Sequence, residues 1–305
     1  MSDKPVVGFI GVGLMGHGMA KNILKGGYPL VVKGNRNRAP VEDLLAQGAE
    51  EVATPREMAE RCDVIHLCLS NSPQIEAVYH GEDGILAGAR PGLIVVDCST
   101  ADPVSTMKLV AALVEKGGEI VDAPLGRTPK EAEEGQLDAM VGGSDAAFER
   151  VRPILECWAG NINRVGPAGS GHKMKLIMNL ISMSYAALYG EATVLAAKVG
   201  LPPETVRRVI GSSRLGNGFF DTFMKYTVDR DRDAHKFSIA NASKDVRYAN
   251  AMAADAGALS LIAAATRQYF AHVEAIGHGD DYVPMLGDHM ARLSGIDMAE
   301  EAAKR

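Results

Sequence analysis

The chain has 305 residues, which is enough for two domains of roughly 100–200 residues each. Hydrophobic residues make up 47% of it and charged residues 23%, the composition of a soluble globular protein. The net charge of −6 argues against a broad nucleic-acid-binding surface, and no apolar run reaches the ~18 residues of a membrane span. A strand is predicted almost at the N-terminus and leaves no room for a signal peptide. We therefore expect a cytoplasmic protein, or one of an organelle matrix without its presequence, that has no nucleic-acid or membrane partners.

The cysteines and histidines show no metal-ligand spacing. The four cysteines contain no CxxC pair, and the eight histidines are scattered without an HxxxH pair. We therefore interpret the cysteines as reduced, partly buried apolar residues and predict no metal site. The cysteines are Cys62, Cys68, Cys98 and Cys157.

A glycine-rich turn separates the first predicted strand, residues 6–10, from a helical segment that ends near residue 27. Gly11 permits a tight turn, Gly13 lets the backbone approach a pyrophosphate, and Gly16 allows close packing of helix against strand. The first N–H groups of the helix are then available to phosphates. A GxGxxG motif in this context predicts a dinucleotide-binding turn, with a purely structural turn as the alternative. The predicted contacts are Gly11, Gly13, Leu14, Met15 and Gly16.

The second predicted strand, residues 28–34, ends in the sequence NRNR instead of the carboxylate that binds the ribose 2′-hydroxyl of NAD. Arg36 and Arg38 could clasp a 2′-phosphate, and no acid stands there to repel it. We therefore predict a preference for NADP(H), with NAD(H) as the alternative coenzyme and an ordinary solvated loop as the alternative role. The predicted contacts are Asn35, Arg36 and Arg38.

Three further buried-strand runs, at residues 63–70, 93–100 and 119–125, alternate with helical stretches such as 103–116. This alternation predicts a parallel sheet with helices on both faces and a ligand at the carboxyl ends of the strands. Small polar residues follow those ends and suit contact with a cofactor, although they are also common in turns. The predicted contacts are Leu69, Ser70, Asn71, Ser99 and Thr100.

The second half of the chain has helical periodicity. Residues 170–198 contain no proline and predict a helix of 29 residues, about 43 Å long. Shorter helices are predicted at 203–212, 219–227, 240–256 and 259–275. We therefore expect an α/β fold: a Rossmann doubly wound parallel sheet (1–166) and an all-α C-terminal domain (167–305), joined by a long interdomain helix. A helix of this length leaves surface to bury, which favours a homodimer or homotetramer.

Two lysines lie near the start of that helix and point in different directions. Residues two apart on a helix project about 200° from each other, whereas residues four apart share a face. Lys175 therefore shares a face with Asn179, and Ser182 continues the stripe, while Lys173 lies on the opposite side. A polar stripe on an apolar helix indicates a ligand cleft, where the lysine could donate a proton. A surface lysine that extends along the helix is the alternative.

Five motifs together resemble the β-hydroxyacid dehydrogenase family over essentially the whole chain: GFIGVGLMG, DCST, DAPLGRT with the following MVGG, GSGHKMKLIMN and SKD. The resemblance implies that Lys175 is the catalytic lysine and Asn179 its partner. It also implies that Thr100 and Lys244 contact the cofactor near the nicotinamide, and that Asp245 anchors the helix of Lys244. Met178 replaces the first amide of the family's usual pair, on a face turned away from Lys175.

A second departure concerns the substrate loop, where the family usually has Ser-Gly-Gly after Asp-Ala-Pro-Val. Here Gly126, Arg127 and Thr128 stand instead, and this GRT loop resembles the 3-sulfolactaldehyde reductase branch. The guanidinium of arginine offers a forked donor to an oxyanion. We expect a sulfonate, or a carboxylate held more electrostatically. Pairing of Arg127 with Glu131 or Glu133 is the structural alternative.

The expected reaction is reversible hydride transfer between NADP(H) and a small anionic aldehyde or hydroxyacid. Candidate aldehydes are 3-sulfolactaldehyde and the methylmalonate, tartronate and succinic semialdehydes. Two rivals are a non-catalytic dinucleotide-binding module and an imine reductase on the same architecture, and the presence of Lys175 argues against both. The predicted substrate contacts are Thr100, Gly126, Arg127, Thr128 and Ser182.

Overall fold

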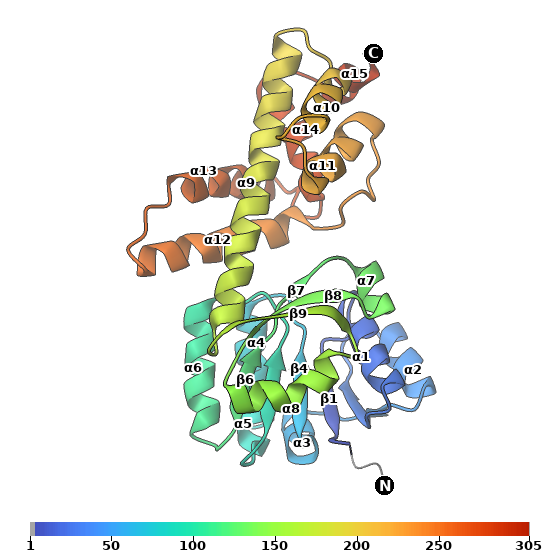
Figure 1. The fold of residues 1–305 in the computed structure, drawn as a ribbon, viewed down its shortest axis with the longest axis vertical. Coiled ribbons are helices and arrows are strands. Elements are labelled where there is room, and N and C mark those ends of the chain that lie inside the picture. The colour runs from blue at the N-terminus through green and yellow to red at the C-terminus, as the bar shows by residue number, and fades with distance from the viewer. Residues whose placement is uncertain (1–3, 305) are drawn as a thin grey trace. The chain divides into compact units, whose positions relative to one another are not determined.

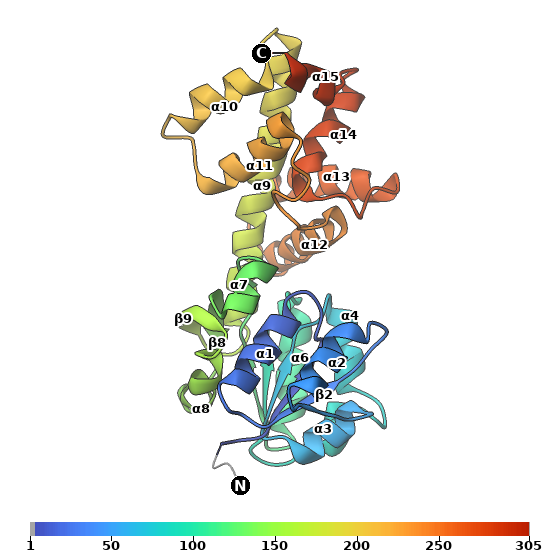
Figure 2. The same cartoon turned by 90° about the vertical axis from the view of Figure 1, so that its right-hand side faces the viewer.

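The computed structural model describes residues 4–304. The chain forms two compact units, one up to Lys175 and the other from Leu176 onward. The division falls inside one long helix, α9 (Ser170–Lys198). It lies later in the chain than the boundary predicted after residue 166. Figures 1 and 2 draw both units from two directions.

The N-terminal unit is built on one sheet, which has nine strands within residues 4–304. Six strands run parallel in the order β3-β2-β1-β4-β5-β6. Beyond β6 the sheet becomes mixed, because β8 is antiparallel to β6 and β7, and β9 is parallel to β8. The strands are β1 (Val7–Ile10), β2 (Leu30–Lys33), β3 (Glu50–Glu51), β4 (Val64–Leu67), β5 (Ile94–Asp97), β6 (Glu119–Asp122), β7 (Leu125–Gly126), β8 (Leu137–Gly142) and β9 (Ala159–Gly166).

Helices cover both faces of this sheet. Successive side chains of a strand point to opposite faces, so apolar side chains on each face need a covering layer. Phe9 packs into one apolar cluster with residues of α1, α2 and α8, while Ile10 packs into another with residues of α3, α4 and α6 (Figure 1). This arrangement confirms the predicted doubly wound α/β fold. The helices are α1 (Gly16–Lys25), α2 (Ala39–Ala46), α3 (Pro55–Arg61), α4 (Ser72–Tyr79), α5 (Ile85–Gly88), α6 (Pro103–Val114), α7 (Pro129–Glu134) and α8 (Asp145–Leu155).

Short polar side chains set where several of these helices begin. Thr54, Asn71 and Asp102 each accept a hydrogen bond from a backbone N–H in the first turn of the following helix, and a proline occupies one of the first positions of each. Such caps satisfy N–H groups that have no partner inside the helix, and proline there sacrifices no hydrogen bond. The starts of α3, α4 and α6 are therefore marked in the sequence by a capping residue and a proline.

The C-terminal unit is helical, which confirms the predicted all-α region. The part of α9 beyond Lys175 packs with the later helices around Phe220, Phe223 and Phe270, which are fully buried. The four shorter helices predicted in this region are present within two residues of their expected ends, and α14 and α15 were not predicted. The helices are α10 (Pro203–Gly211), α11 (Gly218–Asp229), α12 (Ile239–Asp255), α13 (Leu261–Ala275), η1 (Val283–Met285), α14 (Leu286–Leu293) and α15 (Met298–Ala303).

Among residues 4–304, α9 is the one helix that is long and apolar enough to cross a membrane, with a mean hydropathy of 1.2 in its most apolar stretch. Of that stretch, 39% is buried inside the protein. A helix at the centre of a helical core can be equally long and apolar, so these two properties alone are weak evidence for a membrane span. Six apolar side chains on α9 are between 40% and 65% exposed: Ile177, Met178, Ile181, Tyr185, Leu188 and Leu195.

His66 of β4 is a fully buried imidazole inside the sheet core. Its ring stacks on Phe9 at a centroid distance of 5.7 Å and meets the edge of Trp158 at 6.2 Å. Burial among apolar groups lowers the pKa of His66 to about 3, because the charged imidazolium would lose its hydration. The ring is therefore neutral in the folded protein throughout the physiological pH range.

We expect His66 to make the N-terminal unit less stable in acid. The unfolded chain takes up a proton on this ring below a pH of about 6.5, whereas the folded chain does so only near pH 3. Stability is therefore fully present above about pH 6.5 and is lost as the pH falls toward 3. Between about pH 7.5 and about pH 5.5 the loss from this residue is about 1.4 kcal/mol.

Urea unfolding of the wild type and His66→Leu at both pH values measures this effect, because leucine fills a similar volume without titrating. We expect the variant to show the weaker pH dependence. Equal pH dependence in the two proteins would contradict the burial argument.

Candidate functional site

The glycine turn between β1 and α1 has the geometry expected of a pyrophosphate-binding turn. Gly11 has a φ of +98°, and a Cβ there would approach the carbonyl oxygen of Cys68 to 2.2 Å. A Cβ on Gly16 would meet the carbonyl oxygen of Gly11 at 2.0 Å, so helix and strand pack closely. A Cβ on Gly13 would meet no atom within 4 Å, and the next side chain, Leu14, is 81% exposed. The backbone at Gly13 is therefore open to a ligand.

The start of α1 is also suited to an anion. Its first turn contains no acidic residue, and the N-cap residue Met15 makes no side-chain capping bond. The leading N–H groups of a helix have no acceptor within the helix, and they attract negative charge. Turn and helix together fit the diphosphate of a dinucleotide, as the sequence predicted.

The loop after β2 brings only one of its two arginines into an ion pair. Arg38 donates two hydrogen bonds to Glu51 of β3, with N–O distances of 2.6 and 2.9 Å. These bonds raise the pKa of Arg38 and lower the pKa of the Glu51 carboxyl. Asn35 and Arg36 are exposed, and Arg36 forms no ion pair with any residue in the described range 4–304. Arg36 is therefore the more available of the two cations for a 2′-phosphate.

The polar residues after β4 and β5 are partly used in holding the sheet edge together. The backbone N–H of Leu69 donates to Ser99 Oγ at 2.9 Å, and the N–H of Ser99 donates to Asp97 Oδ1 at 3.0 Å. Asn71 caps α4. Ser70 is exposed and Thr100 is half-buried at the same edge. Leu69, Asn71 and Ser99 therefore have structural roles in addition to the predicted contact with a cofactor.

A buried carboxylate fixes the start of α9 at the carboxyl end of β6. Asp122 is fully buried, and its two oxygens accept the backbone N–H groups of Gly169 at 2.6 Å and His172 at 2.8 Å. A Cβ on Gly171 would approach the carbonyl oxygen of Met140 to 2.3 Å, so backbone packs on backbone here. The first turn of α9 therefore has a defined position on the sheet.

His172 extends this buried network toward β5. Its Nδ1 lies 2.8 Å from Thr106 Oγ1 of α6, and its Nε2 lies 3.9 Å from Asp97 Oδ2. His172 is fully buried and Asp97 is 3% exposed. The hydrogen bond between imidazole and hydroxyl thus joins α9 to α6 within the N-terminal unit, and the Asp97 carboxylate lies nearby at the end of β5.

Lys175 lies one helical turn beyond this anchor, and the structure distinguishes it from Lys173. Lys175 shares a helix face with Gly171, which packs on the sheet edge. Lys175 is accordingly half-buried, whereas Lys173 is exposed. The two lysines face in the different directions that the helical spacing predicted.

Arg127 occupies a strained position in the loop between β7 and α7. Its φ is +78°, in the left-handed region that residues with a side chain rarely adopt. Its Nε donates to Asp138 Oδ2 of β8 at 3.0 Å, and this hydrogen bond raises the pKa of Arg127. The structural partner of Arg127 is therefore Asp138, and not Glu131 or Glu133 as its sequence neighbours suggest. The guanidinium keeps an exposed side, because the Arg127 side chain is 46% accessible to solvent.

The neighbouring acids have other partners. Thr128 and Glu131 form a capping box at the start of α7, in which the backbone N–H of Thr128 donates to the Glu131 carboxylate at 3.0 Å. Glu133 binds His17 and Lys21 of α1 at 2.7 and 3.0 Å. The α7 end of the loop that carries Gly126, Arg127 and Thr128 is thereby fastened.

Within the C-terminal unit, Asp245 connects two of the residues chosen from the sequence. Asn179 Nδ2 of α9 donates to Asp245 Oδ2 of α12 at 2.6 Å, and Lys244 Nζ lies 3.1 Å from Asp245 Oδ1. Asn179 is 8% exposed and Asp245 is 1% exposed. Ser182 Oγ donates to the carbonyl oxygen of Asn179 at 3.2 Å. The amide of Asn179 therefore has a fixed orientation.

Sequence reasoning did not assign roles to the buried acids Asp97 and Asp122 or to His172. Both acids end apolar strands, IVVD and EIVD, and a carboxylate at the end of a buried strand is the signal that could have identified them. No pattern in the sequence indicates that Arg38 pairs with Glu51 or Arg127 with Asp138, because each pair joins separate segments of the chain.

Family models match both parts of the chain. Residues 6–166 match a model described as the NAD binding domain of 6-phosphogluconate dehydrogenase. Residues 169–287 match one described as the NAD-binding of NADP-dependent 3-hydroxyisobutyrate dehydrogenase. The two matches meet at the start of α9.

Three characterised relatives align with most of the chain. The 2-(hydroxymethyl)glutarate dehydrogenase of Eubacterium barkeri is 32% identical over 98% of this chain and 99% of its own. The 2-hydroxy-3-oxopropionate reductase of Escherichia coli K12 is 34% identical over 96% and 97%. The 3-sulfolactaldehyde reductase of the same strain is 33% identical over 90% and 91%.

Solved structures agree with these relatives. The 3-hydroxyisobutyrate dehydrogenase of Mycobacterium tuberculosis matches with a TM-score of 0.84 and 26% identity, over 94% of this chain and 99% of its own. That of Salmonella typhimurium matches with a TM-score of 0.81 and 27% identity, over 93% and 99%. Fold, glycine turn and relatives agree: the chain belongs to the β-hydroxyacid dehydrogenase family of NAD(P)-dependent oxidoreductases.

Proposed function

We propose that the protein interconverts a short anionic hydroxyacid, or hydroxysulfonate, and its aldehyde, with NADP(H) as the preferred coenzyme and Lys175 as the proton donor and acceptor. The observation that carries the proposal is the half-buried Lys175, one turn beyond the Asp122 anchor of α9. The names of three relatives support the reaction class, since they are dehydrogenases or reductases of hydroxyacids and short aldehydes.

The chain's own residues handle the proton, while the nicotinamide supplies or accepts the hydride when it is bound. In reduction, the ammonium of Lys175 donates a proton to the carbonyl oxygen as negative charge develops on it; in oxidation, the neutral amine removes the hydroxyl proton. Asn179 lies four residues further along α9 and shares a face with Lys175. Because Asp245 holds its amide nitrogen, the amide oxygen is the atom that orients the lysine or the substrate hydroxyl. Ser182 continues this face.

The anionic end of the substrate is proposed to bind the loop of Gly126, Arg127 and Thr128, with Thr100 near the reacting carbon. Arg127 keeps part of its guanidinium exposed while Nε is bound to Asp138, so its outer N–H groups can reach a sulfonate or carboxylate. The 3-sulfolactaldehyde reductase relative favours a sulfonate. The carboxylate semialdehydes named by the sequence analysis remain alternatives.

The coenzyme is proposed to lie along the carboxyl edge of the sheet, from the glycine turn toward Thr100. Lys244 is proposed as a further coenzyme contact. Arg36 is proposed as the main contact to the 2′-phosphate, because Glu51 already neutralises Arg38. NAD(H) is the alternative coenzyme. A non-catalytic dinucleotide-binding module and an imine reductase are the rival functions, and both are disfavoured by the half-buried Lys175.

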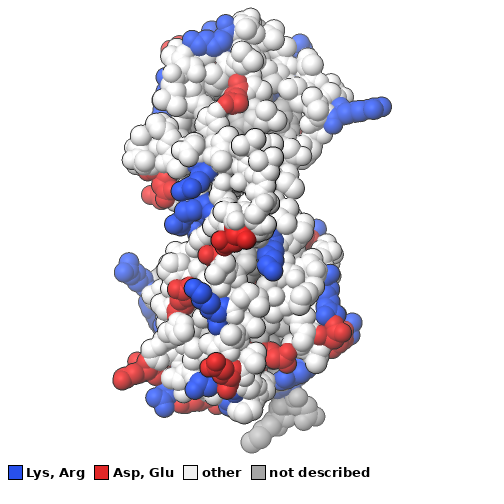
Figure 3. Space-filling model, turned by 90° about the vertical axis from the view of Figure 1, so that its left-hand side faces the viewer, with Lys and Arg blue, Asp and Glu red and all other residues white. Residues whose placement is uncertain are grey.

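We also propose a homodimer or homotetramer. The exposed apolar side chains of α9 support this proposal, because contiguous apolar surface of this kind commonly marks an interface. Figure 3 shows a face on which few charged side chains lie over the helical unit. Light scattering during size-exclusion chromatography tests it: Leu188→Glu should shift the assembly toward monomer, and a monomeric wild type would contradict the proposal.

Lys175→Ala is expected to lower kcat by about 10²–10⁴-fold, the usual contribution of a positioned proton donor, while NADPH still binds. Stopped-flow turnover and NADPH fluorescence measure the two effects separately. Lys173→Ala is the matched control, because this exposed lysine lies two residues away on another face, and it should keep near-normal turnover. Normal turnover in Lys175→Ala would refute the assignment.

Arg127→Gly is expected to lower kcat/KM for the true substrate by about 10–100-fold, through loss of charge-assisted hydrogen bonds. Glycine adopts the left-handed backbone at this position readily, so the change removes the guanidinium without adding strain. An NADPH-coupled panel of the sulfonate and carboxylate aldehydes measures the effect.

Asp138→Asn keeps the guanidinium and should retain turnover, which makes it the control for the same loop. If Arg127→Gly loses turnover of the sulfonate alone, the substrate is the sulfonate. Unchanged kinetics across the whole panel would rule out the loop as the anion site.

Arg36→Ala is expected to raise the KM for NADPH by about tenfold or more and to leave the KM for NADH within about twofold. The reason is that only NADPH carries the 2′-phosphate. Arg38→Ala should have the smaller effect on NADPH, because Arg38 is already paired with Glu51. Initial-rate kinetics with both coenzymes test this, and a parallel rise in both KM values would count against 2′-phosphate recognition.

A further inference from the structure

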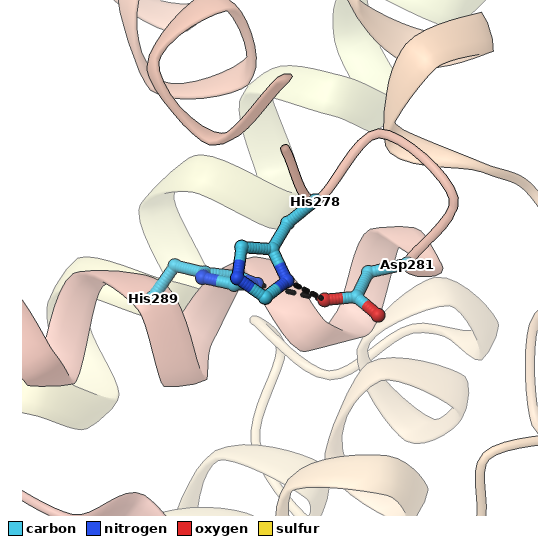
Figure 4. Close-up of side chains that lie close together, drawn as sticks. All are labelled: His278, Asp281 and His289. Atoms are coloured by element: carbon cyan, nitrogen blue, oxygen red, sulfur yellow. Dashed lines mark hydrogen bonds and ion pairs between the residues drawn. The ribbon is translucent and has the colours of Figure 1, made fainter. Parts of the chain in front are cut away.

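Two histidines and one aspartate, none of which has a role assigned above, converge in the C-terminal unit. His278 and Asp281 lie in the segment between α13 and η1, and His289 lies on α14 (Figure 4). One ligand atom from each residue lies within 4.8 Å of the other two. We propose that His278, Asp281 and His289 form a binding site for a divalent first-row transition ion, with Zn²⁺ as the probe.

The distances within the cluster are close to those of a coordination shell. Asp281 Oδ2 lies 3.1 Å from His278 Nδ1 and 2.9 Å from His289 Nε2. A tetrahedral zinc ion with bonds of about 2.0–2.2 Å places its ligand atoms about 3.3–3.5 Å apart. The carboxylate must therefore open only slightly from each imidazole to admit an ion, and the two imidazoles must come within the same distance of each other. Both rings already face the same carboxylate oxygen (Figure 4).

Two of the three ligands are held by the fold, and one can adjust. The carbonyl oxygen of Asp281 accepts the backbone N–H of Ile239 at 2.8 Å, and the next residue, Tyr282, forms a β-bridge to Ser238. The side chain of His289 is 3% exposed, so packing restricts its rotamer, whereas that of His278 is 45% exposed. The exposed imidazole can complete the shell without moving the backbone.

The donor set determines the class of ion. Two imidazoles and one carboxylate suit Zn²⁺, Cu²⁺ or Ni²⁺, whereas Mg²⁺ and Ca²⁺ prefer shells made wholly of oxygen. Three protein ligands leave a fourth position, which a water molecule would occupy. The ion would fasten the segment after α13 to α14, and no catalytic step is assigned to it.

Two arginines beside the cluster repel a bound cation, and the alternative to a metal site is a cluster held by hydrogen bonds alone. Arg232 NH2 lies 3.9 Å from Asp281 Oδ1, and Arg292 NH1 lies 3.4 Å from His289 Nδ1. Coordination through His289 Nε2 places the ring proton on Nδ1, so Arg292 must then turn away into solvent. Without a metal, the carboxylate simply accepts a hydrogen bond from each imidazole, and the cluster is a polar tie between loop and helix.

Equilibrium dialysis of the tag-free full chain against Zn²⁺, with metal analysis of the protein, separates the two readings. We expect one tightly held Zn²⁺ per chain and a loss of affinity of at least about tenfold in His278→Gln and Asp281→Asn. His272→Gln on α13 and Asp280→Asn are the matched controls, because both are exposed neighbours outside the cluster and should bind as the wild type does.

Two further measurements keep the result independent of folding and of the proposed oxidoreductase activity. His278 is exposed, so His278→Gln should fold normally by circular dichroism and retain its dehydrogenase kinetics. Zn²⁺ should raise the Tm of the wild type but not that of His278→Gln, and Co²⁺ should give tetrahedral visible absorption bands only in the wild type. Absence of stoichiometric Zn²⁺ in the wild type, or equal binding by His278→Gln, would contradict the metal site. The cluster would then be a set of hydrogen bonds between loop and helix.

Discussion

The two hydrogen bonds that Asp122 accepts from the start of α9 are the constraint on which the candidate site depends. A buried carboxylate is stable only when its lone pairs are satisfied, and here the backbone N–H groups of Gly169 and His172 satisfy both oxygens. The same bonds orient the positive end of the helix dipole toward the negative charge. Because Lys175 lies one turn further on, its position relative to the sheet edge follows from this anchor.

Several residues that the sequence marks for ligands also hold the protein together. Ser99 accepts a bond from the β4 end, Thr128 caps α7, and Arg38 is paired with Glu51. Such double use is expected at the carboxyl edge of a parallel sheet, where chain ends expose backbone groups that need partners and ligands bind the same groups. A ligand therefore meets side chains whose orientations are already restricted, which lowers the entropy lost on binding.

Much of the fold could be predicted because its signals are local. Alternation of buried strands with helices gave the parallel sheet, and the proline-free periodic stretch gave α9 with its observed ends. The strands β8 and β9 were missed: β9 is largely exposed, with few apolar residues in an alternating pattern, and β8 lies where the sheet changes from parallel to mixed. Their pairing depends on partners distant in sequence, which periodicity does not report.

The sequence by itself determined the family and the glycine turn and singled out Lys175 as a candidate, because glycine spacing, helical spacing and motif order are properties of contiguous residues. Only the tertiary structure decided that Arg127 pairs with Asp138, that Asp245 holds Asn179, and that two histidines meet Asp281. The physical reason is that electrostatic partners are chosen by distance in space. Groups on separate elements interact only after folding has brought those elements together, and the interaction weakens with distance.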